Sequence, residues 1–200
     1  LGGSMITLGL QFLPEFWAIL TGGIPKLVML AEFTADSDEE AYKKALDLTN
    51  AKGSGSGFII KKNGKYYVIT NAHVIESASN ETGSIYVFTI NQSKYEVRVL
   101  GGDSFYDLAV LEFVTPPGTE INTVEFTKTD PNVGDKVYAI GNPLGTYPYS
   151  VTDGIISAKN RARGGLTGKF GFLQHTATLI WGNSGGPLVN EKGEVVGINS

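Results

Sequence analysis

Short runs of β-favouring residues, each closed by turn residues, constrain the fold of this chain more than any other feature. Val, Ile, Tyr and Phe gather in these runs, and Gly, Asn, Asp, Pro and Ser separate them. Asn63-Gly64 gives the clearest signal, because both residues accept the left-handed backbone that a two-residue β-hairpin turn requires. Gly makes up 26 of the 200 residues, nearly twice its average share. The pattern predicts antiparallel strands joined by tight turns.

Eleven such runs can be traced, and Pro116-Pro117-Gly118 divides them into a group of six and a group of five. In one of them Tyr95, Val97 and Val99 alternate with polar residues, as in a half-buried strand. Spacing of this kind is typical of antiparallel barrels and sandwiches. We therefore expect an all-β fold of two antiparallel six-stranded β-barrels, with the last strand of the second barrel missing from this chain. The expected strands are residues 26–33, 56–60, 65–71, 85–90, 94–100 and 107–114, then 135–141, 150–157, 169–176, 186–190 and 194–200.

The chain divides into three expected segments. Residues 1–25 form an N-terminal apolar segment with a short helix starting near Pro14. Residues 26–118 form the first barrel, with residues 34–52 as an exposed, partly helical insertion, and residues 119–200 form the second. Prolines and charged residues interrupt the apolar stretch, so no run approaches the roughly 18 residues that a membrane span needs. No basic stretch precedes it, so we do not expect a signal peptide.

The composition excludes several kinds of chemistry. The chain has no Cys, which removes disulfides, thiol nucleophiles and thiolate metal sites. It has two histidines, His73 and His175, too few for a His-rich zinc site. The net charge of −4 argues against nonspecific nucleic-acid binding, and the basic cluster between Lys159 and Lys169 is expected to be a solvated loop. We therefore expect no metal, no cofactor and no nucleic-acid partner.

Three segments carry residue types suited to nucleophilic catalysis. His73 follows directly after a strand, Asp107 opens an apolar strand, and Ser184 lies in the glycine-rich turn 182–187. A serine hydroxyl needs an adjacent base, the base needs an orienting carboxylate, and glycines let a turn aim N–H groups at one point. Each segment alone is more typical of a structural role, such as a turn or a cap. The three together in a double β-barrel indicate a catalytic triad, with Asp103 as an alternative carboxylate.

With these segments the chain resembles the chymotrypsin-like serine proteases, and among them the HtrA/Deg group. The resemblance runs from about residue 14 to the last residue. It implies that Ser184 is the nucleophile, that His73 is the general base and then acid, and that Asp107 orients His73. It also implies that the N–H groups of Gly182 and Ser184 form the oxyanion hole. The matching motifs are residues 55–60, 70–75, 107–111, 141–145, 151–157, 182–190 and 193–200.

The residues before the nucleophile depart from the family pattern. Residues 175–181 lack the acidic residue and the Asn that HtrA proteins usually carry there, and bulky Trp181 stands beside the oxyanion loop. By resemblance, Thr178 lies near the base of the first specificity pocket, and Asn199 and Ser200 belong to the substrate-binding segment. Thr178 carries no charge, so we expect small or medium uncharged side chains to be preferred.

The sequence thus predicts a serine endopeptidase that cleaves unfolded or exposed polypeptide segments through an acyl-enzyme. The alternative is a weak or inactive HtrA-like module that binds unfolded polypeptides. The intact triad residues favour the first, and the missing last strand favours the second. The resemblance favours an extracytoplasmic location, periplasmic or secreted. Phe12, Phe16 and Trp17 either pack on neighbouring subunits, as in related trimers, or on their own barrel.

Overall fold

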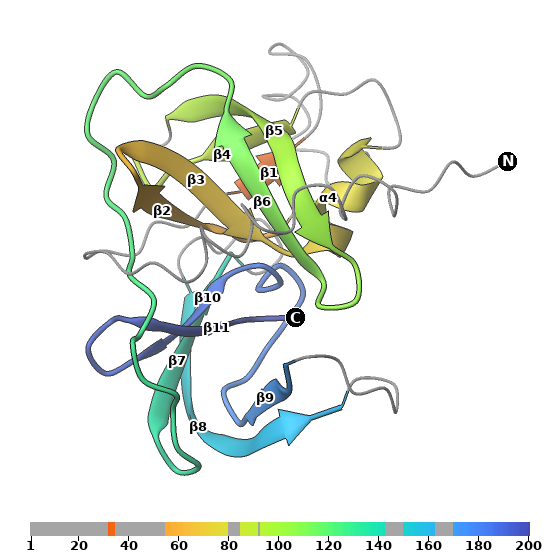
Figure 1. The fold of residues 1–200 in the computed structure, drawn as a ribbon, viewed down its shortest axis with the longest axis vertical. Coiled ribbons are helices and arrows are strands. Elements are labelled where there is room, and N and C mark those ends of the chain that lie inside the picture. Colours follow the sequence, from red (N-terminus) through yellow and green to blue (C-terminus); the bar gives the residue numbers. More distant parts are fainter. Residues whose placement is uncertain (1–31, 35–54, 80–84, 92, 143–149, 163–169) are drawn as a thin grey trace, which may run out of the picture.

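The computed structural model describes residues 32–34, 55–79, 85–91, 93–142, 150–162 and 170–200 (Figure 1). The expected N-terminal helix, most of the expected first strand and the expected insertion except Thr34, which ends strand β1 (Glu32–Thr34), lie outside the described residues. The rest forms two antiparallel sheets, drawn one above the other in Figure 1. The predicted all-β fold class is confirmed.

The first sheet has six strands, and its β2–β3 hairpin shows how local sequence sets the register. The strands are β1 (Glu32–Thr34), β2 (Phe58–Lys62), β3 (Lys65–Thr70), β4 (Ile85–Phe88), β5 (Lys94–Asp103) and β6 (Leu108–Phe113), in the order β1-β4-β5-β6-β3-β2. Asn63 and Gly64 have φ values of 49° and 77°, and Lys62 pairs with Lys65. Positive φ at both central residues marks a type I′ turn, whose twist matches that of the strands. The predicted hairpin is confirmed.

The second sheet has five strands, in the order β11-β10-β7-β8-β9. Each of the eleven expected runs overlaps an observed strand. Four strands end later than predicted: β1 and β2 by one and two residues, and β5 and β8 by three and four, to Asp103 and Arg161. In β5 and β8, irregular positions in the ladders let the pairing continue. The strands of this sheet are β7 (Lys136–Gly141), β8 (Ser150–Arg161), β9 (Phe172–His175), β10 (Pro187–Asn190) and β11 (Val195–Ile198).

A helix that we did not predict, α4 (Ala72–Ser79), follows β3. Val74 and Ile75 are 5% and 3% exposed and pack into the core of the first sheet. Because the helix is short and contains β-branched residues, tertiary packing rather than helix propensity holds it in place. It carries His73 in its first turn. Among the described residues, no helix is long and apolar enough to cross a membrane.

The segment between β6 and β7 joins the two sheets by pairing with both. The N–H of Val124 donates to the carbonyl of Ile59 in β2 at 3.0 Å, and Phe126 pairs in parallel with Val195 of β11. The Phe126 ring lies edge-on to the Phe58 ring, with 5.8 Å between centroids. This shared packing fixes the relative placement of loops that leave the two sheets. The buried cluster that spans both sheets consists of Phe58, Ile60, Ile69, Val110, Val124, Val189 and Val195.

Candidate active site

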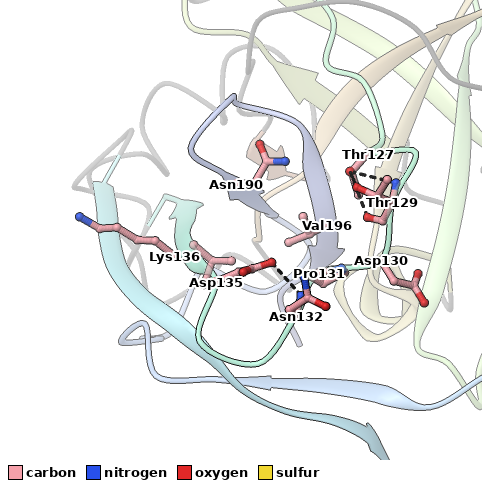
Figure 2. A pocket seen from close by; sticks show the side chains of 10 residues that line it. Thr127, Thr129, Asp130, Pro131, Asn132, Asp135, Lys136, Asn190 and Val196 are labelled. Atoms are coloured by element: carbon pink, nitrogen blue, oxygen red, sulfur yellow. Dashed lines mark hydrogen bonds between the residues drawn. The ribbon is translucent and has the colours of Figure 1, made fainter.

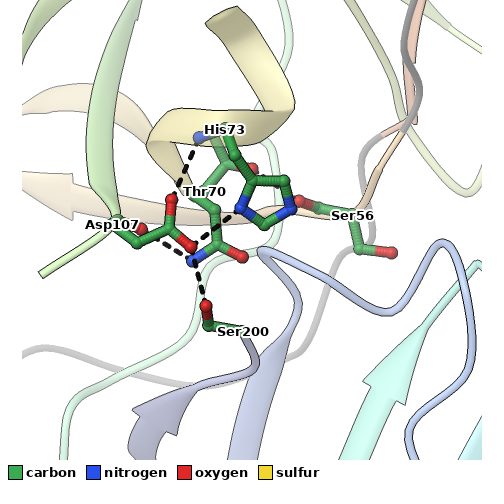
Figure 3. A network of polar contacts seen from close by, with 6 residues as sticks. Ser56, Thr70, His73, Asp107 and Ser200 are labelled. Atoms are coloured by element: carbon green, nitrogen blue, oxygen red, sulfur yellow. Dashed lines mark hydrogen bonds and ion pairs between the residues drawn. The ribbon is translucent and has the colours of Figure 1, made fainter. Parts of the chain in front are cut away.

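His73 and Asp107 make a two-point contact at the edge of the first sheet. His73 lies in the first turn of α4, and Asp107 immediately precedes β6. The Nδ1 of His73 is 2.8 Å from Asp107 Oδ2, and the His73 backbone N–H donates to Asp107 Oδ1 at 3.0 Å (Figure 3). The carboxylate therefore sets the orientation of the ring. It favours the tautomer with the proton on Nδ1, which makes Nε2 the basic nitrogen.

Asp103, the alternative carboxylate, has a different place. Its Oδ1 accepts hydrogen bonds from the N–H groups of Phe105 at 2.9 Å and Tyr106 at 3.0 Å. An aspartate that binds the backbone two and three residues ahead stabilises a turn. Asp103 thus shapes the loop before β6, and Asp107 is the carboxylate in contact with His73.

Burial and hydrogen bonding act on Asp107 in opposite directions. Its side chain is 6% exposed, against 49% for that of His73. Burial alone raises the pKa of the Asp107 carboxyl, but hydrogen bonds from the His73 ring, the Ser200 hydroxyl and the His73 N–H together hold that pKa below its ordinary value. The Ser200 hydroxyl donates to Oδ2 at 2.7 Å, and Asn71 Nδ2 donates to the Asp107 carbonyl at 2.8 Å. Asp107 therefore stays charged behind the His73 ring at neutral pH.

The backbone N–H groups of the Ser184 loop fall into two kinds. Those of Gly182 and Ser184 make no hydrogen bond to any described residue. Two such unpaired N–H groups, close together in the chain, are what an oxyanion hole requires. The N–H groups of the other loop residues donate to backbone carbonyls at 2.9–3.0 Å. The Asn183 N–H donates to the Ile180 carbonyl, the Gly185 N–H to the Asn199 carbonyl and the Gly186 N–H to the Asn183 carbonyl.

A glycine lets the Ser184 loop lie against the end of β3, close to His73. A Cβ on Gly185 would lie 2.2 Å from the Thr70 hydroxyl oxygen and 3.1 Å from the Asn71 nitrogen, so no side chain fits there. The structure therefore makes the Ser184 loop a neighbour of the segment that carries His73. Within the described part of the chain, the Ser184 hydroxyl has no hydrogen bond to the His73 ring. Contacts of this kind often tighten only when substrate binds.

The residues expected to bind substrate occupy different environments. Thr178 is exposed, and its carbonyl accepts a hydrogen bond from the Thr152 hydroxyl at 2.7 Å. Asn199 is 1% exposed, and its Nδ2 donates to the Pro187 carbonyl at 3.2 Å. Its side chain thus holds the chain segment in place rather than facing solvent. The Ser200 hydroxyl is directed to Asp107, as described above.

Sequence reasoning missed two serine contacts. The residues Ser200 and Asp107 are 93 positions apart in the chain, so no local sequence pattern predicts their hydrogen bond. Ser56, which is 0% exposed, donates its hydroxyl to the carbonyl of Gly182 at 2.6 Å. A serine between two glycines at the start of an apolar strand was the available signal. Figure 3 shows Ser56 on the far side of the His73 ring from Asp107.

A pocket of about 330 Å³ lies in the second sheet, apart from these residues. Mostly polar side chains between residues 127 and 137 line it together with Asn190 and Val196 (Figure 2). His73, Asp107 and Ser184 are not among its lining residues. Among the described residues, no group of three or more His, Asp or Glu side chains is placed to hold a metal ion. The candidate site is therefore the region around His73 and the Ser184 loop.

The fold and this arrangement belong to one class of protein. Residues 55–198 match the family model described as the trypsin-like peptidase domain, and the chain belongs to that family. A crystal structure of the serine endoprotease from Yersinia pestis matches with a TM-score of 0.64 and 34% identity, covering 86% of this chain and 53% of that chain. The fold is thus of the chymotrypsin-like, two-barrel type.

Curated relatives narrow the class to HtrA-type serine proteases, which confirms the predicted resemblance. The serine endoprotease DegS of Salmonella typhimurium is 42% identical over 146 residues, which is 73% of this chain and 39% of the relative. A probable periplasmic serine endoprotease, DegP-like, of Ectopseudomonas mendocina is 43% identical over 151 residues, 75% of this chain and 30% of the relative. The chain spans less than half the length of either relative.

Proposed function

We propose that this protein is a serine endopeptidase whose catalytic triad is Ser184, His73 and Asp107. The two-point contact between His73 and Asp107 carries the proposal, because it creates an oriented base beside a serine loop. The N–H groups of Gly182 and Ser184, which pair with none of the described residues, support it because they can form an oxyanion hole. The names of the relatives, which are serine endoproteases, point the same way.

The reaction proceeds in two halves with a covalent ester between them. Ser184 Oγ attacks the carbonyl carbon of the peptide bond while His73 Nε2 takes the hydroxyl proton. The carbonyl oxygen becomes an oxyanion, which the N–H groups of Gly182 and Ser184 stabilise. The C–N bond then breaks, and His73 gives the proton to the leaving amine. Water repeats the steps on the ester: His73 takes a proton from it, and Ser184 leaves with that proton.

A weak or inactive module that binds unfolded polypeptides is the second candidate. The observation in its favour is that, among the described residues, the Ser184 hydroxyl is not hydrogen-bonded to the His73 ring. Turnover separates the two candidates, because a binding module retains polypeptide without cleaving it.

The proposed substrates are unfolded or exposed polypeptide segments with small or medium uncharged residues before the cleaved bond. Thr178 supports this preference, because it offers no charge to pair with a Lys, Arg or Glu side chain. Single methylene groups change selectivity by only about 1–3 kcal/mol, so discrimination among apolar residues is modest. A peptide-library profile dominated by Arg, Lys or Glu at that position would contradict this specificity.

We also propose an extracytoplasmic location and a homotrimer formed through residues 1–25. The location rests on the relative from Ectopseudomonas mendocina, a probable periplasmic serine endoprotease. The trimer rests on the apolar N-terminal segment, which lies outside the described residues. Cell fractionation tests the first, and sedimentation equilibrium of the full-length protein tests the second, with a monomer as the contradicting result.

The direct test of the proposed activity is the cleavage of unfolded casein by the wild-type protein and by Ser184→Ala. The variant should fold, because Ser184 is only half-buried, and should lose several orders of magnitude in rate. The activity of the wild type should rise with pH as His73 loses its proton, because the neutral imidazole is the form that accepts the Ser184 proton. His175→Gln should keep that rise and His73→Gln should remove the activity. Near wild-type cleavage by Ser184→Ala would rule out the assigned nucleophile.

A further inference from the structure

Ser56 ties the first sheet to the Ser184 loop through two hydrogen bonds. It lies just before β2 and is 0% exposed. Its backbone N–H donates to the Ser184 carbonyl at 2.8 Å, and its hydroxyl donates to the Gly182 carbonyl at 2.6 Å. One residue just before β2 therefore holds the carbonyls on both sides of Asn183.

The other polar atoms of Ser56 are anchored as well. Its hydroxyl oxygen accepts a hydrogen bond from the Asn142 N–H at 2.8 Å, and its carbonyl accepts one from the Thr70 hydroxyl at 2.7 Å. Asn142 follows β7 of the second sheet and Thr70 ends β3 of the first. The Ser56 hydroxyl thus has one geometry, fixed by both sheets, from which it donates to Gly182.

These bonds act on the peptide units that flank the Ser184 N–H. The Gly182 carbonyl belongs to the peptide unit between residues 182 and 183, and the Ser184 carbonyl to the unit between residues 184 and 185. The Ser184 N–H belongs to the unit in between. Because Ser56 fixes both outer units, it limits rotation of the middle one. The Gly182 N–H belongs to the peptide unit between residues 181 and 182, directly before the unit of the bonded carbonyl, so it is restrained from one side.

The space around Ser56 leaves little room for the loop to shift. A Cβ on Gly55 would lie 2.7 Å from both methyl carbons of Val74 and 3.2 Å from the Ser184 carbonyl oxygen. Val74 is the neighbour of His73 in α4. The backbone before Ser56 is therefore packed between the helix that carries the base and the loop that carries the nucleophile.

We propose that Ser56 is a positioning residue for the oxyanion hole: its hydroxyl holds the Gly182 carbonyl so that the Gly182 and Ser184 N–H groups keep their places. The inference rests on the serine endopeptidase activity proposed above. Ser56 acts through the loop backbone, and the hydrogen bonds to His73 and Asp107 come from other residues. Its loss should therefore affect the stabilisation of the oxyanion and leave the titration of His73 unchanged.

The test uses Ser56→Ala in the full-length protein. Loss of one oxyanion-hole donor costs about 100- to 1,000-fold in kcat, so misplacing donors by loss of a support should cost about 10- to 100-fold. KM should change by less than about 3-fold, because the bound substrate carries no oxyanion. A peptide boronate, which forms a tetrahedral adduct on the serine, should bind more weakly in proportion to the loss in kcat/KM. The pH at which activity rises should stay the same.

Thr89→Val is the matched control. Thr89 is also buried, at 2% exposed, and its hydroxyl also makes two hydrogen bonds, to Asn91 Oδ1 and to the Ser93 carbonyl. These bonds lie in the β4–β5 hairpin, outside the site. The control should be less stable than wild type but keep its kcat. A merely structural role for Ser56 predicts the same behaviour for both variants.

The outcomes separate the inference from the proposed function. The inference alone is overturned if the wild type is active and Ser56→Ala keeps its kcat. It is also overturned if Ser56→Ala shifts the pH at which activity rises. A wild type that folds and cleaves nothing overturns the proposed function and the inference with it. Should Ser56→Ala not fold, Ser56→Cys keeps a side chain of similar size and a weaker donor. The Ser56→Cys variant should then also lose kcat, but by less than the roughly 10- to 100-fold expected for Ser56→Ala. An unchanged kcat would overturn the inference.

Discussion

Asp107 is a residue whose hydrogen bonds outweigh the effect of its burial. A buried carboxylate normally has a raised pKa, but three donors from His73 and Ser200 lower that of Asp107. Its backbone also adopts the left-handed conformation, with φ of 56°, which Asp tolerates better than most residues. The charge and the backbone geometry together keep the carboxylate aimed at the His73 ring.

Asp107→Asn should lose activity and flatten the acid dependence of stability. The folded-state pKa of Asp107 is lower than its ordinary value of 3.8, so the charged carboxylate stabilises the fold above about pH 3.8. This stabilisation disappears as the pH falls below 3.8 through the folded-state pKa. The variant should lack that loss, measured as the free energy of unfolding in urea at several acidic pH values, and its kcat should fall about 1,000- to 10,000-fold. An acid dependence equal to that of the wild type would refute this account of Asp107.

The residues of the candidate triad could be proposed from the sequence because nucleophilic catalysis by a serine needs a His base and a carboxylate, and the sequence holds one segment suited to each role. The supporting contacts could not. Ser200 and Ser56 reach Asp107 and Gly182 across 93 and 126 positions of the chain, and such contacts follow from how the two sheets pack. The hydrogen bond from the Asn199 side-chain amide to the Pro187 carbonyl likewise follows from the packing of the chain and has no local signal.

At the scale of elements, two turns require glycine for different physical reasons. Gly64 and Gly185 have φ values of 77° and 85°, so both favour glycine over other residues. A Cβ on Gly64 would meet nothing within 4 Å, whereas one on Gly185 would lie 2.2 Å from the Ser56 carbonyl oxygen and from the Thr70 hydroxyl. The first turn is constrained by conformation alone and the second by close packing as well.

Gly64→Ala should cost about 1 kcal/mol of unfolding free energy and leave casein cleavage unchanged, because the strain is local. Gly185→Ala should be more destabilising and should also remove cleavage, because the Ser184 loop must move away from β3. Urea unfolding and initial rates of cleavage measure both effects. Equal losses of stability with equal activity in the two variants would count against this reading of the loop.

The strands could be predicted better than the helix for a physical reason. Alternating apolar residues and the Asn63-Gly64 pair act locally, and these signals located each expected run. Helix α4 depends on the burial of Val74 and Ile75 against the first sheet, which no local pattern shows. The extensions of β5 and β8 depend on irregular pairing with neighbouring strands, which is likewise not local.

At the scale of the whole molecule, the two sheets form one packed unit rather than two independent ones. The segment between them pairs with β2 and with β11, and one buried cluster crosses from sheet to sheet. The chain has no internal repeat that would have predicted this packing. The candidate site lies where loops of both sheets meet, so its geometry depends on the shared core.

Phe126→Ala should destabilise both sheets together. Phe126 is half-buried and packs edge-on against Phe58, so its removal should cost about 2 kcal/mol. Unfolding should remain a single transition, with far-UV circular dichroism and aromatic fluorescence changing at the same guanidinium concentration. Trp181→Ala is the control for stability, because Trp181 is 88% exposed and its loss should change the free energy by less than about 0.5 kcal/mol. Two separate transitions would show that the sheets unfold independently.

The central claim is that Ser184 is a nucleophile activated by His73. The most direct measurement is the reaction of the full-length, folded protein with a serine-directed peptidyl phosphonate, with the modified residue located by mass spectrometry. We predict one label per chain, on Ser184, and no label in Ser184→Ala or His73→Ala. A label on another residue, or a folded wild-type protein that takes no label, would contradict the account.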